Sequence, residues 1–370
     1  RAAETFQNWQ EQGILVQEKK PALYLYRQEF QVNGHTYLRT GFMCGLKAED
    51  YSSGQVLPHE ETLPKHKADR LELMRATQAN FSPIFGLYSD PEKIIDRTLI
   101  ETIGNRHPDL EVTDWAQEKH SIWVITDEDV IQKVTDIMKK LKIYIADGHH
   151  RYETAAAYGK EMAARGKTGY DHILITLVNL YDEGLIVLPT HRLVKNLAEF
   201  DLAQFLHRVR SYFEVIPLPL LDSKKAALDK LLQEMSKSGA FGTSFGLYGG
   251  NSEFYLLKLK EDTDLEQVIP QEKSPAWRNL DVTILHTLIL ENILGIGAKE
   301  RVSEGFLSYT RDDNYAIEAV DRGEFQFSLL MNPPKVEEVT AVAEAGEKMP
   351  QKSTFFYPKV ISGLVINKLG

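Results

Sequence analysis

The chain has 370 residues, of which 43% are hydrophobic and 26% charged, so it can bury more than one globular core. A formal net charge of −10 argues against binding to extended nucleic acid, which needs a basic surface. The single cysteine, Cys44, excludes an intramolecular disulfide, and no apolar run approaches the ~18 residues that a membrane span needs. These features predict a cytoplasmic globular protein without a membrane partner, and they leave open an association between copies of the chain.

The first half of the sequence alternates helices with strands. It begins without Met at what reads as the middle of a helix (2–12), so we expect an N-terminal segment to precede it. Asn33-Gly34 between two alternating runs predicts a β-hairpin, because this dipeptide favours a tight turn between antiparallel strands. Periodicity predicts strands at 22–30, 35–46, 83–88, 110–115, 120–127, 142–146, 172–182 and 185–194, and helices at 66–80, 91–104, 127–141 and 151–166.

The character of the sequence changes near residue 196. Residues 196–279 read as a smaller α+β module, with helices at 199–213 and 223–239 and strands at 214–220, 244–250 and 253–260. After residue 280 we predict helices at 281–295 and 336–346 and strands at 306–310 and 325–332, followed by a polar, aromatic end. The prediction is therefore an α+β fold with a core at 1–195, the module at 196–279, and a C-terminal region at 280–370 that packs back on the core.

The most informative segment is DGHHR at 147–151, which lies at a predicted strand-to-helix turn. A helix N-terminus offers backbone N–H groups and a partial positive charge that suit a phosphate, and Gly148 lets the backbone approach a ligand closely. His149, His150 and Arg151 add donors and positive charge, while Asp147 can accept a hydroxyl proton or hold a metal ion. The alternative is a structural role, with Asp147 as a helix cap and His149 in the core, but four functional side chains in a row favour a site.

A second polar segment, HEETLPKHKADR at 59–70, precedes a predicted helix. Its candidate site residues are His59, Glu60 and Arg70. Thr62 can instead cap the helix while the charges form a solvated face, so a site and an ordinary surface are equally open. The HExxH zinc motif does not apply, because Leu and Pro follow Thr62.

Two further segments carry weaker candidates. His191 and Arg192 follow an apolar strand whose end can face a crevice, although a capped turn explains them nearly as well. Lys352, Ser353 and Thr354 lie in MPQKSTFFYPK (349–359), where phosphate donors stand beside aromatic residues without the spacing of a Walker loop. We take these three as candidate nucleotide-binding residues, and His191 and Arg192 as candidates near the substrate.

The whole chain resembles the bacterial and archaeal family DUF 1015, whose members are often labelled SpoOJ/ParA/ParB/repB proteins. The matching stretches span nearly the whole chain: HEETLPKHKADR, IADGHHRYETA, LDVTILHTLILENILGI and MPQKSTFFYPK. ParB relatives that bind CTP usually read Gly-Glu-Arg-Arg at the loop. The loop here departs from that pattern, and this departure, with the acidic balance, weakens a chromosome-partitioning role.

The order of the motifs also resembles the ParB-like core of free-serine kinases. His59-Glu60 precedes a helix, Pro83-Ile84 begins a strand, and Asp147 to Arg151 follow after an extra segment at about 88–140. The resemblance implies a ParB/sulfiredoxin-like core carrying an insertion. It further implies Asp147 as the base toward a substrate hydroxyl, Glu60 as a substrate or metal ligand, and the loop from Gly148 to Arg151 as the phosphate site.

We therefore predict a nucleotide-dependent phosphotransferase that uses ATP or ADP with Mg²⁺ on a small hydroxylated metabolite, such as the amino acid serine. Asp147, Glu60 and His149 are the candidate catalytic residues. A non-catalytic, ParB-like nucleotide-binding regulatory module is the alternative. A metal-dependent hydrolase that uses His59, Glu60, His149 and His150 ranks last.

Overall fold

A computed structural model describes residues 1–60, 62, 64–219, 222–302 and 305–370, of which the side chains of 64–66 and 302 are not described. Backbone contacts divide the chain into two compact units. The first unit is Arg1–Ile186 with Phe356–Gly370, and the second is Val187–Phe355. The mixture of helices and sheets in both confirms the predicted α+β class.

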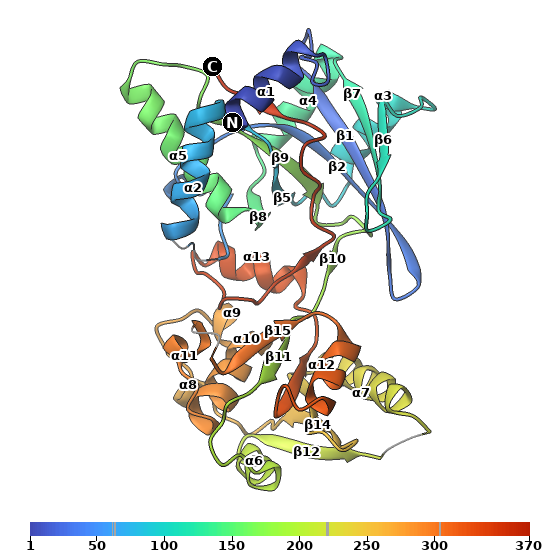
Figure 1. Ribbon diagram of the computed structural model, residues 1–370, viewed down its shortest axis with the longest axis vertical. Helices are drawn as coiled ribbons and strands as arrows, with labels where there is room; N and C mark the ends of the chain where they lie inside the picture. Colours follow the sequence, from blue (N-terminus) through green and yellow to red (C-terminus); the bar gives the residue numbers. More distant parts are fainter. Residues whose placement is uncertain (61, 63, 220–221, 303–304) are drawn as a thin grey trace. The chain divides into compact units, whose positions relative to one another are not determined.

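The first unit is built on an eight-stranded sheet with the order β3-β8-β5-β9-β2-β1-β7-β6 (Figure 1). Its strands are β1 (Leu23–Val32), β2 (His35–Lys47), β3 (Val56–Leu57), β5 (Ile84–Tyr88), β6 (Leu110–Thr113), β7 (Lys119–Ile125), β8 (Ile143–Asp147) and β9 (His172–Asn179). Its helices are α1 (Ala2–Glu11), the short η1 (Tyr51–Ser53), α2 (Pro64–Thr77), α3 (Ile94–Ile103), α4 (Glu128–Met138) and α5 (His149–Ala164). A separate two-stranded sheet joins β4 (Ala79–Asn80) to β18 (Asn367–Lys368).

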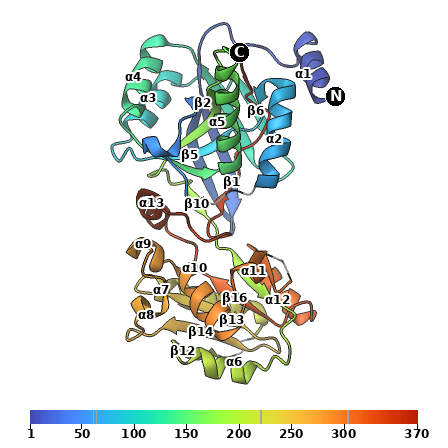
Figure 2. The same ribbon diagram turned by 90° about the vertical axis from the view of Figure 1, so that its left-hand side faces the viewer.

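The alternation of side chains along β1 and β2 gives the sheet two covered faces. Leu25 and Phe42 pack on one face, in a core that also takes residues of α2, α3, α4 and α5. Tyr26 and Met43, one position along each strand, turn to the other face and pack against the C-terminal segment 360–365. Figure 2 shows α5 in front of this sheet, with α2 on one side and α3 and α4 on the other.

The predicted hairpin is confirmed. Val32 pairs with His35 across Asn33 and Gly34, and both turn residues have positive φ, as the tight turn between twisted antiparallel strands requires. The segment predicted as an insertion at 88–140 supplies β7, which pairs with β1, and α3 and α4, which complete the main core. It is thus an integral layer of the first unit.

The second unit contains a six-stranded sheet with the order β12-β14-β13-β16-β11-β15. Its strands are β11 (His191–Val194), β12 (Phe213–Leu218), β13 (Ser244–Tyr248), β14 (Phe254–Leu259), β15 (Leu307–Thr310) and β16 (Phe327–Met331). Its helices are α6 (Leu202–Val209), α7 (Lys224–Gly239), α8 (Leu265–Val268), α9 (Pro275–Arg278), α10 (Asp281–Ile284), the π-helix Leu285–Ile293, α11 (Ala298–Val302), α12 (Asp313–Asp321) and α13 (Val336–Glu344). Strands from the regions 196–279 and 280–370 share this sheet, so residues 196–279 and 280–355 belong to one unit.

Two short strands, β10 (Ile186–Val187) and β17 (Phe356–Tyr357), pair where the chain passes from one unit to the other. The single strand predicted at 185–194 is therefore two strands, β10 and β11, with Pro189 in the break between them, where it can donate no ladder hydrogen bond. No helix in the described part of the chain is both long and apolar enough to cross a membrane.

Candidate active site

The turn between β8 and α5 consists of one residue, Gly148. It has φ 99° and ψ 25°, a left-handed conformation that residues with a Cβ adopt only with strain. As the N-cap residue, Gly148 has no side chain with which to cap the first turn of α5. The predicted strand-to-helix turn is confirmed, and it sets the DGHHR motif at the positive end of a 16-residue helix.

Replacing Gly148 by alanine is expected to destabilise the protein by about 1–2 kcal/mol, because an L-residue is strained in the left-handed region. The new Cβ would also lie 2.8 Å from the Arg151 Nε and Nη2 atoms and displace the guanidinium. Urea unfolding measures the effect. Gly166→Ala is the matched control, since that glycine has φ 72° and open space around it. An equal loss in both variants would mean that backbone strain alone acts and that the Arg151 contact contributes nothing.

Asp147 is held between two cations. Arg151 Nη2 donates to Oδ2 at 2.6 Å, and Lys359 Nζ donates to Oδ1 at 2.5 Å. Arg151 lies one turn along α5, whereas Lys359 comes from the C-terminal segment of the same unit. The three side chains are between 21% and 40% exposed, so a ligand in solvent can reach them. The carboxylate predicted to act as a base thus stands between two groups that can bind phosphate.

The segment that carries Lys359 is anchored by a buried arginine, Arg39. Its guanidinium donates to the carbonyl oxygens of Tyr357 at 3.1 Å and Pro358 at 2.6 Å, and it also bonds the Gln28 amide oxygen. Gln28 in turn donates to the carbonyl of Lys359 at 3.2 Å. Burial lowers the pKa of Arg39 to about 10, and the guanidinium lies 4.7 Å from the centre of the Phe85 ring. This network fixes the backbone of 357–359 and therefore positions the Lys359 amine.

His59, Glu60 and His149 form a second group beside the motif. The His59 backbone N–H donates to His149 Nε2 at 3.2 Å, so Nδ1 carries the proton of the neutral ring and faces Glu60 Oε2 at 3.5 Å. The two imidazoles are buried and meet edge to face, 4.7 Å apart. The ring of His149 is thus turned toward protein groups and faces the partly exposed Glu60 carboxylate, and its catalytic role stays a prediction.

Burial lowers the pKa of His59 to about 4, with a smaller contribution from the Lys359 charge. Because this folded-state pKa lies below the unfolded value near 6.5, the stability that His59 contributes is full above about pH 6.5. It is lost as the pH falls toward 4, where the unfolded chain binds a proton that the folded chain does not. We expect the free energy of unfolding of His59→Gln to fall by about 2–3 kcal/mol less than that of the wild type over this pH range, because glutamine takes up no proton.

The measurement is the unfolding free energy of wild type and His59→Gln between pH 7 and 4.5. The difference between the two proteins is the quantity to compare, because Asp182 and Asp281, whose pKa values burial raises to about 6, titrate with the opposite sign. His172→Gln is the control, since this side chain is half exposed. Parallel curves for wild type and His59→Gln would contradict the prediction.

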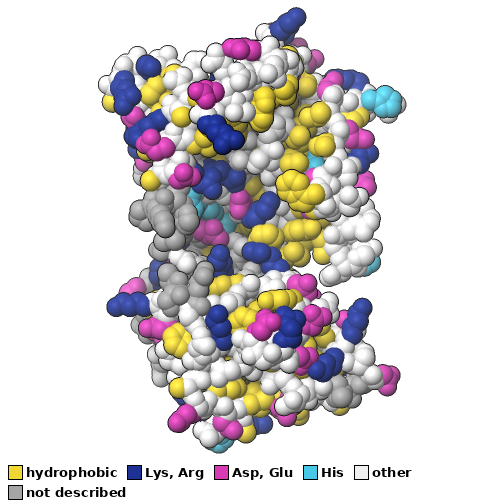
Figure 3. Space-filling model, viewed as in Figure 1, with side chains coloured by type: hydrophobic (Ala, Val, Ile, Leu, Met, Phe, Trp, Pro, Cys, Tyr) yellow, Lys and Arg dark blue, Asp and Glu magenta, His cyan; other side chains and the backbone are white. Residues whose placement is uncertain are grey.

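The beginning of α2 is tied to α5 through Glu153. Thr62 Oγ1 donates to the Glu153 carboxylate at 2.6 Å, and Lys67 forms an ion pair with the same group. Arg70 lies on the exposed face of α2 and lines a small pocket with Arg151 and Ser82. Burial and then the Arg70 charge lower the pKa of Arg151, while Asp147 raises it. In Figure 3, basic, acidic and histidine side chains lie beside one another on the face that it shows.

The remaining residues of the two motifs are placed as follows. His150 is partly exposed in the first turn of α5, and its carbonyl accepts a 2.7 Å hydrogen bond from Thr154. Glu61, and the side chain of Lys65, lie outside the described residues. The structure thus brings together, within the first unit, the candidates from the two motifs: His59, Glu60, Arg70, Asp147, Gly148, His149, His150 and Arg151.

The other predicted site residues belong to the second unit. His191 is buried: its Nδ1 accepts from the Met331 backbone N–H at 3.0 Å, so Nε2 carries the proton and donates to Asp313 at 2.7 Å. Arg192 is also buried and bonds the carbonyl oxygens of Thr190 and, at 3.2 Å, Lys352. These side chains hold the turn that contains the next group of candidates.

Lys352, Ser353 and Thr354 form that turn. Lys352 has φ 59°, and the buried Ser353 hydroxyl donates to the Pro350 carbonyl. Thr354 is partly exposed. The Lys352 carbonyl and the Ser353 hydroxyl therefore make hydrogen bonds that stabilise the turn. The nucleotide-binding roles of the three residues stay predictions.

Sequence reasoning missed two residues of the site, Lys359 and Arg39. Lys359 is the last residue of MPQKSTFFYPK and was available from that motif as a further phosphate donor. Arg39 stands in the apolar strand LRTGFMC, and a charge in such a run indicates a buried guanidinium with a fixed set of acceptors. Either residue could have been singled out by its type and position.

The chain is similar, at low sequence identity, to several solved structures. It is similar to a solved free serine kinase in complex with AMP, at 15% identity and a TM-score of 0.39 over 87% of this chain and 91% of that one. A conserved hypothetical protein from Pyrococcus furiosus gives 16% identity and a TM-score of 0.35, over 87% and 94%. SbnI from Staphylococcus aureus, truncated at its C-terminus, gives 9% and 0.40, over 88% and 87%. Among curated proteins none matches the chain. The family model "protein of unknown function (DUF1015)" matches residues 1–283, and the chain therefore belongs to that family.

Proposed function

We propose that this protein is a nucleotide-dependent phosphotransferase that phosphorylates a hydroxyl group of a small metabolite, with the reaction centred on Asp147. The observation that carries the proposal is a reachable carboxylate held between Arg151 and Lys359 at the positive end of α5. The substrate class, an amino acid such as serine, rests on the motif order that resembles free-serine kinases. A ParB/sulfiredoxin-like core within residues 1–195 belongs to the same proposal.

The cations have the chemistry that a phosphoryl group requires. Arg151 offers a planar fork for two oxygens, and Lys359 offers a mobile point charge on the opposite side of Asp147. When a nucleotide phosphate enters, both can turn from the carboxylate to the phosphate oxygens, aided by the positive end of α5. Arg70, in the pocket beside Arg151, adds a third positive charge. Binding the donor thereby releases Asp147 for proton transfer.

In the proposed step, the substrate hydroxyl loses its proton to an Asp147 carboxylate oxygen, and its oxygen forms the new bond to the terminal phosphorus of the nucleotide. The bond from that phosphorus to the bridging oxygen breaks, and the nucleotide leaves one phosphate shorter, as ADP from ATP or AMP from ADP. Arg151 and Lys359 stabilise the charge on the transferred group. In this proposal Glu60, whose carboxylate faces His149, binds the ammonium group of an amino acid.

Mg²⁺ fits this site as a companion of the nucleotide. Such an ion usually binds one or two carboxylates together with substrate phosphates, and Asp147 and Glu60 are the carboxylates at hand. When bound, it would neutralise charge on the phosphates. Among described residues, neither carboxylate belongs to a preformed group of three metal-ligating side chains.

The test is incubation of the protein with ATP or ADP, Mg²⁺ and a panel of hydroxy amino acids, with detection of the phosphorylated product and of the shortened nucleotide. Calorimetry with each nucleotide measures binding separately. We expect one acceptor to be phosphorylated. Binding without product from any acceptor would favour the non-catalytic regulatory module, and absence of both would overturn the proposal. Lys352→Met, measured in the same calorimetry, tests the predicted contribution of the Lys352 side chain, and an unchanged Kd would remove that side chain from the site.

A further inference from the structure

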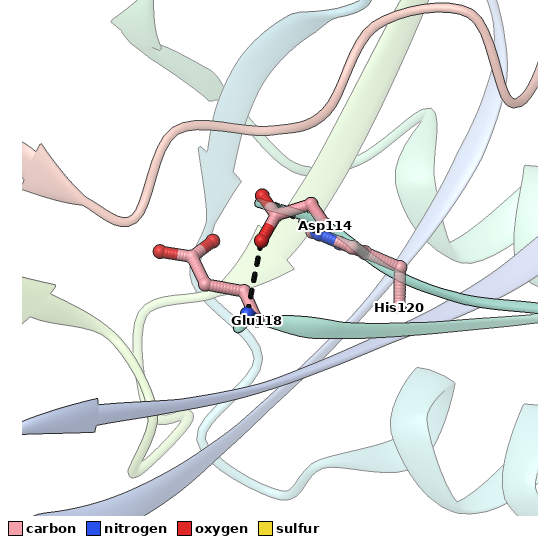
Figure 4. A group of neighbouring side chains, drawn as sticks. All are labelled: Asp114, Glu118 and His120. Atoms are coloured by element: carbon pink, nitrogen blue, oxygen red, sulfur yellow. Dashed lines mark hydrogen bonds and ion pairs between the residues drawn. The ribbon is translucent and has the colours of Figure 1, made fainter. Parts of the chain in front are cut away.

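A compact group of three potential ligands lies in the first unit, where a short loop joins β6 to β7. Asp114 and Glu118 bound this loop and His120 is in β7. Figure 4 shows the two carboxylates and the His120 side chain gathered at the loop. One ligand atom from each residue lies within 4.8 Å of the other two. None of the three belongs to the proposed phosphotransferase site.

Asp114 and Glu118 also accept hydrogen bonds that stabilise the loop and its contact with β1. Asp114 Oδ1 accepts the backbone N–H groups of Ala116 and Glu118, each at 2.9 Å, which closes the loop. Glu118 Oε2 accepts from the Gln28 amide at 3.0 Å. Glu118 also shares a side-chain hydrogen bond with Tyr357, whereas Asp114 Oδ2 is directed toward His120.

The buried ring of His120 has a nitrogen without a hydrogen-bond partner among the described residues, which indicates a ligand. Its side chain is 1% exposed, and its Nδ1 shares a 2.7 Å hydrogen bond with the Tyr26 hydroxyl. Its Nε2 makes no hydrogen bond to the residues that the structure describes and lies 3.5 Å from Asp114 Oδ2. Two ligands bonded at about 2.1 Å to a tetrahedral ion are about 3.4 Å apart, so this separation suits a shared metal better than a direct hydrogen bond.

The charge balance agrees with this geometry. Glu118 is buried and Asp114 half-buried. No ion pair of the described residues joins either carboxylate to a lysine or arginine, and the charge of the buried Arg39 acts on Glu118 alone of the two. Two neighbouring carboxylates in a partly dry site repel each other unless a cation compensates them. An imidazole nitrogen beside two carboxylate oxygens favours a borderline transition ion over Mg²⁺ or Ca²⁺, which take oxygen ligands.

We propose that Asp114, Glu118 and His120 form a binding site for a divalent transition-metal ion of the Zn²⁺ type. With the ion in place, Nδ1 of His120 carries the proton and donates to Tyr26, which is the usual second hydrogen bond of a metal-bound histidine. The ion links the loop to Gln28 on β1 through Glu118. This makes it a brace for the β6–β7 hairpin, independent of the reaction at Asp147.

The experiment is calorimetric titration of metal-stripped protein with Zn²⁺, with Mg²⁺ as a parallel arm. We expect one Zn²⁺ per chain, no comparable heat from Mg²⁺, and a loss of affinity of at least 100-fold in His120→Gln. Asp114→Asn is a second variant that keeps the Oδ1 acceptor closing the loop, and it should lose affinity while unfolding at the wild-type temperature without metal. His172→Gln, whose half-exposed ring is paired with its neighbour Asp171, is the matched control and should bind as wild type does.

Substitution with Co²⁺ supplies an independent readout, because a tetrahedral site with a histidine nitrogen gives visible absorption bands that free Co²⁺ lacks. Absence of stoichiometric Zn²⁺ binding would overturn the proposal. So would binding in His120→Gln within threefold of wild type, or an equal loss in His172→Gln, either of which would assign the ion to adventitious surface ligands. None of these outcomes depends on the kinase assay, so this proposal and the proposed function fail separately.

Discussion

Asp147→Asn is expected to lower phosphoryl transfer by at least 100-fold, measured as product formation with the acceptor that the panel identifies. Asparagine is isosteric with aspartate but cannot take up the hydroxyl proton, and a positioned general base contributes about 10²–10⁴-fold to rate. The binding of nucleotide should respond differently. In wild type the Asp147 carboxylate competes with phosphate for Arg151 and Lys359. Without that charge, the two cations are free to bind phosphate, so nucleotide affinity should stay equal or rise.

The two readouts separate catalysis from folding. Asp136→Asn is the matched control, because this exposed carboxylate on α4 is paired with Lys139 at 2.9 Å and touches no part of the site. It should leave both rate and affinity unchanged. If Asp147→Asn keeps a rate within threefold of wild type, Asp147 is not the base. If Asp147→Asn loses nucleotide binding and turnover together, the ion pairs of Asp147 stabilise the loop. The proposal that Asp147 accepts the proton would then be wrong.

Several features that form the site could be predicted from short stretches of the sequence. The Asn33-Gly34 turn, the alternation along β1 and β2, and the single glycine between β8 and α5 are short-range features whose physics is complete within a few residues. The same is true of Arg151, which reaches Asp147 because residues four apart share one face of a helix. These elements could be predicted without knowledge of the rest of the chain.

The remaining features depend on partners far away in sequence. Lys359 pairs with Asp147 across 212 positions, and Arg39 reaches Pro358 across 319. No periodicity or capping rule encodes such a contact, since the order in which strands join a sheet decides it. His149 gives the opposite lesson. The motif predicted a catalytic role for His149, whereas the burial of its ring against the His59 backbone and Glu60 depends on the tertiary structure and could not be predicted.

Arg39→Met is expected to destabilise the first unit by about 3 kcal/mol, which corresponds to a fall in Tm of about 6–12 °C. Methionine fills a similar volume but removes the donors that Arg39 supplies to the carbonyl groups of Tyr357 and Pro358 and to the Gln28 amide. Removing one member of a buried polar network costs more than its net contribution, because the remaining members keep their desolvation penalty. Part of this cost is offset, since the variant no longer buries a charge.

The loss should be local as well as global, because Arg39 holds the backbone on which Lys359 is carried. Hydrogen exchange should therefore quicken first in residues 356–370, which cover one face of the sheet, before the core around Leu25 is affected. Arg106→Met is the matched control: that arginine is half exposed and paired with Asp109 at 3.0 Å, and such surface pairs contribute about 0–1 kcal/mol. Arg39→Lys retains the charge but has no planar fork to reach several acceptors at once, so it should fall between wild type and Arg39→Met. Equal stability of Arg39→Met and Arg106→Met, with unchanged exchange in 356–370, would show that the segment bearing Lys359 is held by other contacts, and the positioning role of Arg39 would have to be abandoned.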